Sequence, residues 1–194
     1  NKRNKDNDIF ELTIDNKSNA ISGRFLDEDE IIIFPITEDS ITRSGSKIAP
    51  HAISDELSYL SKEIQPQKNE VYMAGVQELL EYEENNNCES FRIIGNYIIK
   101  NRILDDFLKN YLGATDYQID DKFALKFNIQ NDKDKIVEKS LNLNKVFITF
   151  KLSKEFVGDV SLTRDVNLHN FYLGFVRNKN KQSDNVLYCD LTGK

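Results

Sequence analysis

The chain has few of the residues that build disulfide frameworks or zinc sites. Its 194 residues include only two cysteines, Cys88 and Cys189, and two histidines, His51 and His169. The cysteines lie far apart and no CxxC pair occurs, so a reduced, cytoplasmic compartment is the simplest interpretation. A zinc site made from these four residues is an alternative, but their spacing gives it little support, and we predict neither a metal nor a cofactor.

Long apolar segments are also absent. No run approaches the roughly 20 residues that a helix needs to span a bilayer. Residues 1–8 (NKRNKDND) are too polar for a secretory signal peptide. The sequence therefore predicts no contact with a membrane. Because the chain begins with Asn1 and ends in the residues CDLTGK, we expect it to be a fragment of a longer protein.

A surplus of basic residues is missing as well. The formal net charge is −6 and the sequence pI is near 5.1, whereas general-purpose nucleic-acid-binding proteins carry a basic surface. A local basic site is still compatible with this charge, because salt screens charges beyond roughly 8–10 Å. With 39% hydrophobic and 30% charged residues, the composition is that of a globular protein with one domain, or one domain and a small lobe.

The first part of the sequence has the alternation of β-strands. Residues 9–14 and 20–26 alternate around a turn at 15–19, which predicts a hairpin. The apolar run 31–34, stopped by Pro35, predicts a third, more central strand. The residues expected on the inner face are Phe10, Leu12 and Ile14 on the first strand and Ile21, Gly23 and Phe25 on the second.

Four helices are predicted next. The first begins near Ser54 as its N-cap and carries Leu57, Leu60 and Ile64 at helical spacing. The others are expected at about 69–84, 87–98 and 101–112, and Gly113 ends the last. Their short connections favour a compact helical layer.

After the helices, apolar and polar residues alternate again, as in β-strands. Residues 123–129 and 146–152 predict two strands separated by a charged turn at 131–135. A last helix is expected at about 165–177, and 186–189 is typical of a closing strand. Because the helices are grouped instead of alternating with strands, the sequence predicts an α+β fold of antiparallel strands and a helical layer, with residues 1–194 forming one domain that has a small helical lobe.

The segment 37–52 has the composition of an anion site. Arg43 and Lys47 bracket the run Ser44-Gly45-Ser46, in which glycine permits a backbone geometry that aims N–H groups at a ligand. The phosphate-binding motif GxxxxGK[ST] is absent. The alternative is a solvated loop whose serines and threonines only cap turns.

A catalytic interpretation has weaker support. His51 and Asp55 are four residues apart with Ser44, Ser46 and Ser54 nearby, but a catalytic triad needs geometry, and the GxSxG motif is absent. The acidic run at 78–84 is most simply a solvated helix face, and it lacks the spacing of an EF-hand or a two-metal site. We therefore predict that the protein is not an enzyme.

A family resemblance gives this segment more weight. The string at 35–51 (PITEDSITRSGSKIAPH), followed by Asp55, Tyr59 and Leu60, resembles the N-terminal region of the large subunit of type I CRISPR Cascade complexes of the I-B and I-C kind. That family has the pattern R-S-S/G-x-K-x-P…D…Y-L and later C-x-x-T-G. The matching positions are Arg43, Ser44, Gly45, Lys47, Pro50, Asp55, Tyr59, Leu60, Cys189, Thr192 and Gly193.

The resemblance implies a non-catalytic nucleic-acid-recognition subunit of an antiviral defence complex. In such complexes the guide RNA (crRNA) reads the target sequence, while the large subunit reads the short PAM beside it. The implied partners are the crRNA 5′ handle, target double-stranded DNA and other Cascade subunits. Under this hypothesis the nucleic-acid-binding residues are Arg43, Ser44, Gly45, Ser46, Lys47 and His51. The alternatives are a protein-interaction module whose acidic faces dock basic partners, and a small hydrolase that uses His51 and Asp55.

Overall fold

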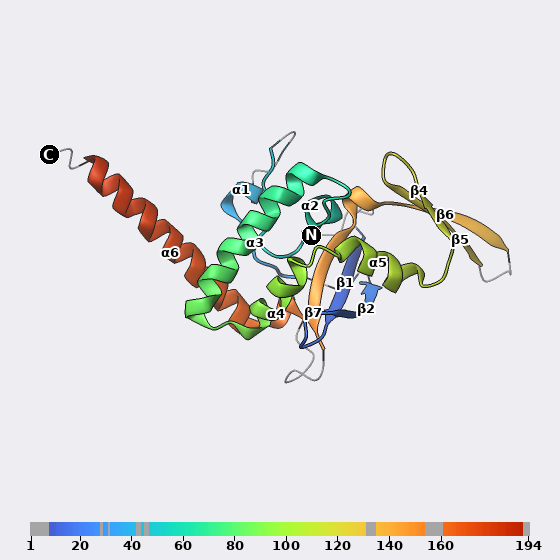
Figure 1. The fold of residues 1–194 in the computed structure, drawn as a ribbon, viewed down its shortest axis with the longest axis horizontal. Coiled ribbons are helices and arrows are strands. Elements are labelled where there is room, and N and C mark those ends of the chain that lie inside the picture. The colour runs from blue at the N-terminus through green and yellow to red at the C-terminus, as the bar shows by residue number, and fades with distance from the viewer. Residues whose placement is uncertain are drawn as a thin grey trace.

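The computed structural model describes residues 8–27, 29–30, 32–41, 44, 47–130, 135–153 and 161–191 (Figure 1). Within these ranges the side chains of Glu38, Thr163 and residues 181–191 are not described. The fold is α+β, with antiparallel strand pairs and grouped helices, as the sequence predicts.

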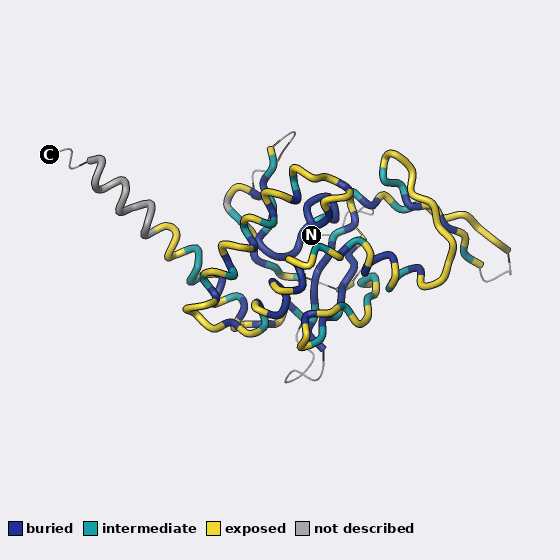
Figure 2. The backbone as a smooth tube through the Cα atoms, viewed as in Figure 1, coloured by how far each residue is buried: buried dark blue, intermediate teal, exposed yellow. Residues whose placement is uncertain are grey.

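The central sheet has four strands in the order β2-β1-β7-β3. β1 (Ile9–Ile14) and β2 (Ala20–Phe25) form the predicted antiparallel hairpin. β7 (Phe147–Leu152) lies parallel to β1, and the short β3 (Asp55–Glu56) pairs antiparallel with β7. The sheet is therefore mixed, and β1 in its middle is buried along almost its whole length (Figure 2).

The inner face of the hairpin differs from the prediction at one residue. Ser22 is opposite Thr13, but Ala20 is opposite Ile14, so Ile21 is the extra residue of a bulge. Its side chain is 53% exposed, although it was expected on the inner face. Gly23 does face inward, and a Cβ there would overlap the ring of Phe10.

The helical layer follows the hydrophobic pattern. α3 (Pro66–Asn86), α4 (Glu89–Ile98) and α5 (Ile103–Leu112) confirm the second, third and fourth predicted helices. α3 begins earlier than expected because Pro66, which lacks a backbone N–H, is suited to the first helical turn. α4 packs against β1 and α5 against β2. Their buried residues include Tyr72, Val76, Leu79, Phe91, Ile94, Ile98, Ile103 and Phe107.

Two predicted elements near the start of this layer are wrong. The first helix was expected at 54–64, but the chain forms β3 and then only the four-residue α2 (Leu57–Leu60). Pairing of residues 55–56 with β7 displaces the helix start, and the Ser54 hydroxyl bonds Thr149 Oγ1 (3.3 Å) instead of capping a helix. Residues 32–37 have no regular structure, so no strand exists there. Their backbone is held by a side chain, because Tyr172 Oη donates to the Ile36 carbonyl.

A second, three-stranded antiparallel sheet projects from the body as an arm (Figure 1). It consists of β4 (Tyr117–Ile119), β5 (Ala124–Gln130) and β6 (Ile136–Asn142). Of these only β5 was predicted, and most of the expected turn at 131–135 lies outside the described residues. Tyr111 on α5 joins the arm to the body through an edge-to-face contact with Phe127, with ring centroids 5.4 Å apart.

The C-terminal part of the described chain is one helix. Two short 3-10 helices, Leu143–Lys145 and Leu162–Arg164, flank β7, and α6 follows at Val166–Leu191. The closing strand expected at 186–189 is therefore wrong, because the backbone there continues the helix and no glycine or proline after Gly174 interrupts it. No helix in the described part of the chain is both long and apolar enough to cross a membrane.

Candidate nucleic-acid interface

The segment 37–51 is closed at its base by hydrogen bonds. Thr37 Oγ1 donates to the Pro50 carbonyl at 2.8 Å, which brings the two ends of the segment together. Thr37 also precedes the short helix α1 (Glu38–Ile41) and exchanges bonds with Ser40: the Ser40 amide donates to Thr37 Oγ1 at 3.2 Å, and Thr37 N donates to Ser40 Oγ at 3.1 Å. These reciprocal bonds satisfy amides that a helix start otherwise leaves without acceptors.

His51 is held at the base of this loop by a hydrogen bond and by two aromatic neighbours. Its Nδ1 lies 2.8 Å from Ser40 Oγ, and this hydroxyl donates in turn to the Thr37 carbonyl at 2.7 Å. The imidazole ring lies 5.1 Å from the ring of Phe34 and 6.3 Å from that of Phe147, measured between centroids. His51 therefore has a structural environment that fixes its orientation.

A fully buried carboxylate anchors the end of the loop. Asp55 accepts hydrogen bonds from the backbone N–H of His51 at 2.7 Å and of Glu56 at 2.8 Å, and its exposed fraction is 0%. Charge-assisted bonds of this kind are stronger than those between neutral groups. Burial, with a smaller contribution from the charge of Asp55, raises the pKa of Tyr72 well above its usual value, which keeps this phenol neutral and able to donate to the Ile53 carbonyl.

The lysine of the predicted site bonds an acidic residue of the same loop. Lys47 Nζ donates to Asp39 Oδ1 at 2.8 Å, and both side chains are largely exposed. The hydrogen bond and the charge of Lys47 lower the pKa of Asp39. An anion that approaches Lys47 must therefore compete with Asp39.

The structure describes half of the predicted site. Ser44 is exposed, Lys47 is exposed beside Asp39, and His51 is partly buried at the base. Arg43, Gly45 and Ser46 lie outside the described residues.

Three residues that shape this loop were not predicted as part of the site: Thr37, Asp39 and Ser40. For Thr37 and Ser40, the available signal was a hydroxyl directly before a short helix and a second hydroxyl three residues later, within that helix. The Asp39–Lys47 pair has no such local signal, because residues eight apart meet only through the fold of the loop.

The hydrogen bonds among the described residues differ from the Ser-His-Asp arrangement considered from the sequence. The hydroxyl bonded to the imidazole belongs to Ser40, and Asp55 accepts from backbone amides of His51 and Glu56. In a catalytic triad the carboxylate orients the imidazole itself. The Ser54 hydroxyl is buried against Thr149. These residues instead form a structural support for the loop.

The described residues also contain no cluster of three or more His, Cys, Asp or Glu side chains suited to a metal ion. Cys88 is buried beside Ser90, and His169 Nε2 lies 2.9 Å from the Leu162 carbonyl. The side chain of Cys189 lies outside the described part.

An apolar groove of about 290 Å³ lies beside the loop. The segment that leads into the loop forms one wall, with Ile33 and Ile36 58% and 45% exposed. The first half of α6 forms the other wall, where Leu173 is 50% exposed. The polar loop is therefore flanked by apolar surface, an arrangement common at the rim and core of binding interfaces.

Comparison with protein-family models, curated proteins and solved structures finds no match to this chain.

Proposed function

We propose that the chain is a non-catalytic nucleic-acid-recognition subunit of an RNA-guided antiviral defence complex, similar to the large subunit of type I Cascade. In this proposal the loop at 37–51 contributes to recognition of the PAM, to contacts with the crRNA 5′ handle, or to both. The residues that contact nucleic acid are Arg43, Ser44, Gly45, Ser46 and Lys47, and His51 supports them from the base of the loop.

The observation that carries the proposal is the anchoring of this loop. Thr37, Ser40, Pro50 and His51 link its two ends, and buried Asp55 joins them to the central sheet. Between these fixed ends the described residues Ser44 and Lys47 are exposed. A loop held by a rigid base and carrying hydroxyls and cations is suited to phosphate contacts, which fix the position of a protein on nucleic acid.

The acidic body is consistent with a subunit of a larger assembly. A net charge of −6 gives the chain little general attraction for nucleic acid. Most of the affinity for nucleic acid would then come from neighbouring subunits and from base pairing by the guide RNA. The loop would contribute recognition of the PAM or of the crRNA 5′ handle. The structural roles of His51 and Asp55 favour recognition over hydrolysis as the function of this segment.

Fluorescence anisotropy with two labelled probes tests the proposal: a PAM-bearing DNA duplex, and an RNA with the crRNA 5′ handle. The protein is the full chain, alone and in the reconstituted complex. The double variant Arg43→Ala, Lys47→Ala should weaken binding to one probe or both. A matched double variant, Lys62→Ala, Lys145→Ala, removes the same charge from exposed positions elsewhere and should bind like the wild type. Equal affinities for all three proteins on both probes would overturn the proposal.

A further inference from the structure

A cavity of about 740 Å³ shares no lining residue with the apolar groove beside the loop. The end of α3, the start of α4 and the first half of α6 enclose it. Its volume is within the range of roughly 300–1,000 Å³ that small-molecule and side-chain sites occupy. None of the residues assigned to the nucleic-acid site lines it.

The walls of this cavity combine aromatic rings with amide side chains. Tyr82 and Phe171 lie with ring centroids 5.3 Å apart, and Gly174 keeps the space beside the Tyr82 hydroxyl open, because a Cβ there would lie 2.9 Å from that oxygen. The amides come from Asn86, Asn87, Asn167 and Asn170. Such walls offer carbonyl acceptors and the negative faces of rings, which both suit cations.

The charges around the cavity are acidic. Asp165 and Glu89 line it, and the described lining residues include no lysine or arginine. Asp165 is only 8% exposed and accepts a hydrogen bond from the Leu168 amide at 2.9 Å, which caps the start of α6. A nearly buried carboxylate in this position attracts positive charge into the cavity.

A second buried carboxylate, that of Glu83, lies behind the wall of the cavity and does not line it. Glu83 lies on α3 between the lining residues Tyr82 and Asn86, and it is 5% exposed. Its Oε1 atom has no hydrogen-bond partner in the described part of the chain. The charges of both Asp165 and Glu83 add to burial in raising the pKa of Cys88, a lining residue, so both carboxylates act on this cavity.

Buried charges without compensation are costly, and proteins usually pair them with a cation. The described side chains do not form a metal site, and the carboxylates of Asp165 and Glu89 in the lining disfavour an anion. An organic cation in the cavity can contact the carboxylates of Asp165 and Glu89, the amide oxygens and the aromatic faces together.

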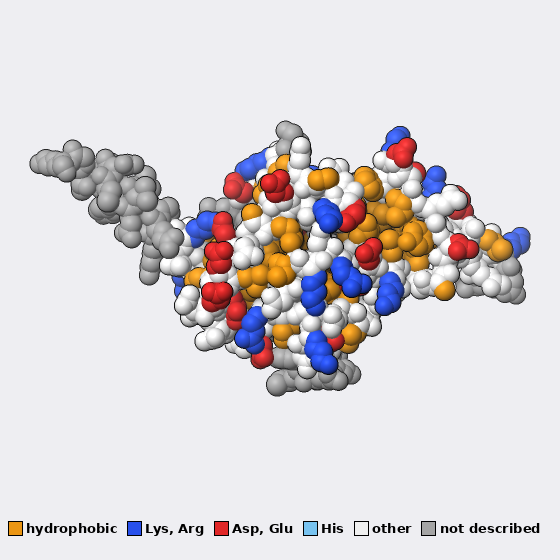
Figure 3. Space-filling view, viewed as in Figure 1, with side chains coloured by type: hydrophobic (Ala, Val, Ile, Leu, Met, Phe, Trp, Pro, Cys, Tyr) orange, Lys and Arg blue, Asp and Glu red, His pale blue; other side chains and the backbone are white. Residues whose placement is uncertain are grey.

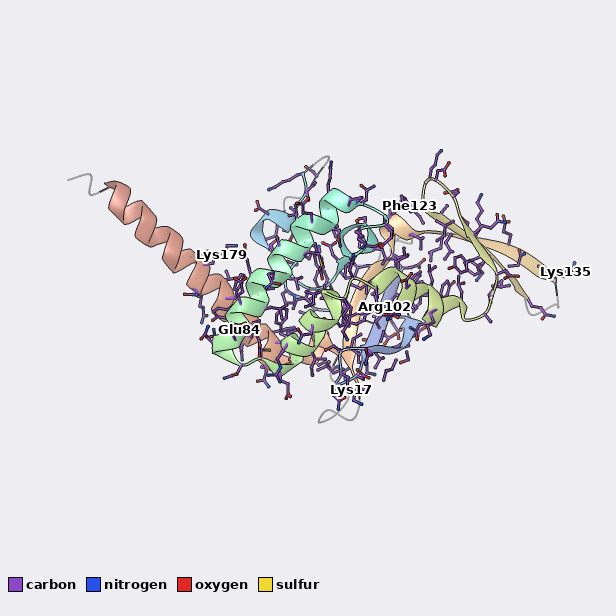
Figure 4. The ribbon with its side chains drawn as sticks, viewed as in Figure 1. Lys17, Glu84, Arg102, Phe123, Lys135 and Lys179 are labelled. Carbon is purple, nitrogen blue, oxygen red and sulfur yellow. The ribbon has the colours of Figure 1, made fainter. Side chains whose placement is uncertain are left out.

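We propose that this cavity is a binding site for a guanidinium or alkylammonium group. The site does not depend on the nucleic-acid function, since the two regions share no residue. Acidic side chains also gather along α3 beside α6 (Figure 3), where Glu78, Glu81 and Glu84 are exposed. Glu84 lies at the end of α3 near α6, and Lys179 on α6 donates to Glu78 Oε2 at 2.7 Å (Figure 4). This acidic surface favours the approach of a cation.

The test uses agmatine, which carries one guanidinium and one ammonium group. Binding to the full chain is measured by titration calorimetry, and the unfolding midpoint is measured with and without agmatine. Sodium chloride at the same ionic strength is the blank. Glu83→Gln and Asp165→Asn each remove one charge with little change of shape, and Asn still caps α6. Glu81→Gln is the matched control, because it removes the same charge from an exposed position on the same helix as Glu83.

The wild type should bind agmatine saturably, and its unfolding midpoint should rise with the ligand. Glu83→Gln and Asp165→Asn should each weaken binding by roughly tenfold, while Glu81→Gln stays within about twofold of the wild type. Without ligand, Glu83→Gln should unfold at the same temperature as the wild type or higher, because it removes an uncompensated buried charge. Loss of binding in this variant is then not a result of unfolding.

Two further ligands identify the source of the cation. A short arginine-containing peptide should bind more tightly than agmatine if the natural ligand is a side chain of a partner protein. Spermidine or agmatine should bind more tightly if it is a free polyamine. Absence of saturable binding to all three ligands would overturn the proposal. So would equal weakening by all three variants, because that result indicates only general attraction to an acidic surface.

Discussion

The backbone N–H of His51 donates to the fully buried carboxylate of Asp55 across 2.7 Å. This bond joins the end of the 37–51 loop to β3 and, through β3, to the central sheet. The loop that we propose to bind nucleic acid is thereby fixed to the central sheet.

Asp55→Ala should lower the free energy of unfolding by about 2–4 kcal/mol, because it leaves the His51 and Glu56 amides without their charged acceptor in a buried site. Urea unfolding followed by circular dichroism measures this change. Asp116→Ala is the control at an exposed position, and we expect a change within about 0.5 kcal/mol. Equal stabilities of the two variants would show that Asp55 does not anchor the loop.

Ser40→Ala should loosen the loop more than it destabilises the whole protein. The substitution removes the hydroxyl that contacts His51 Nδ1 and bonds Thr37, at an expected cost of about 1–2 kcal/mol. Hydrogen exchange should become faster at 37–51 and stay unchanged in α4. Ser44→Ala, at an exposed position of the same loop, should leave both regions as in the wild type.

Asp39→Asn should strengthen binding of nucleic acid, because it removes the carboxylate that bonds Lys47. We expect a gain of about threefold or more in affinity for the preferred probe, in line with the modest strength of exposed ion pairs. Asp29→Asn, an exposed change of equal charge outside the loop, is the control. A gain of the same size in both variants would indicate a general charge effect.

The same ion pair has a defined pH dependence. Lys47 holds the pKa of Asp39 below its usual value of 3.8, so the pair is complete above that pH and is lost as the pH falls through the lowered pKa. NMR titration of the Asp39 carboxyl should show this low pKa in the wild type. Lys47→Gln should return it toward 3.8; an unchanged titration in that variant would mean that Lys47 is not the cause.

Alkaline pH should destabilise the fold through its buried tyrosines. Burial and the neighbouring charge of Asp106 raise the pKa of Tyr97, whose hydroxyl donates to Asp106 Oδ2 at 2.9 Å. Because the folded pKa lies above the unfolded value of about 10, the stabilisation is present below pH 10 and falls as the pH rises further. Unfolding free energies measured between pH 8 and 11 should decline less steeply in Tyr97→Phe than in the wild type.

Local patterns were sufficient to predict the amphipathic elements. α3, α4, α5, β1 and β5 are where the hydrophobic period places them, since their burial depends on residues two to four positions apart. Elements determined by distant partners were missed. Residues 55–56 became a strand because β7 pairs with them. The segment 32–37 has no strand partner, and its Ile36 carbonyl accepts a hydrogen bond from the distant Tyr172.

In the candidate site, too, the residue types were predictable from the sequence but the contacts between distant residues were not. The cations and hydroxyls of the loop are visible in the sequence, but the bonds of His51 to Ser40 and of Lys47 to Asp39 depend on how the loop folds back. The acidic cavity was not predicted, because its walls come from three helices. The carboxylates of the run at 78–84 were expected on a solvated helix face, whereas Glu83 among them is buried.

The salt dependence of binding tests the central claim most directly. Affinity for the PAM duplex and the 5′-handle RNA is measured between about 50 and 200 mM salt for the wild type and for the Arg43→Ala, Lys47→Ala variant. If the loop contacts phosphates, the slope of log K against log salt for the preferred probe should decrease by roughly one for each cation removed. An identical slope and affinity in the two proteins on both probes would contradict the assignment of this loop to nucleic-acid recognition.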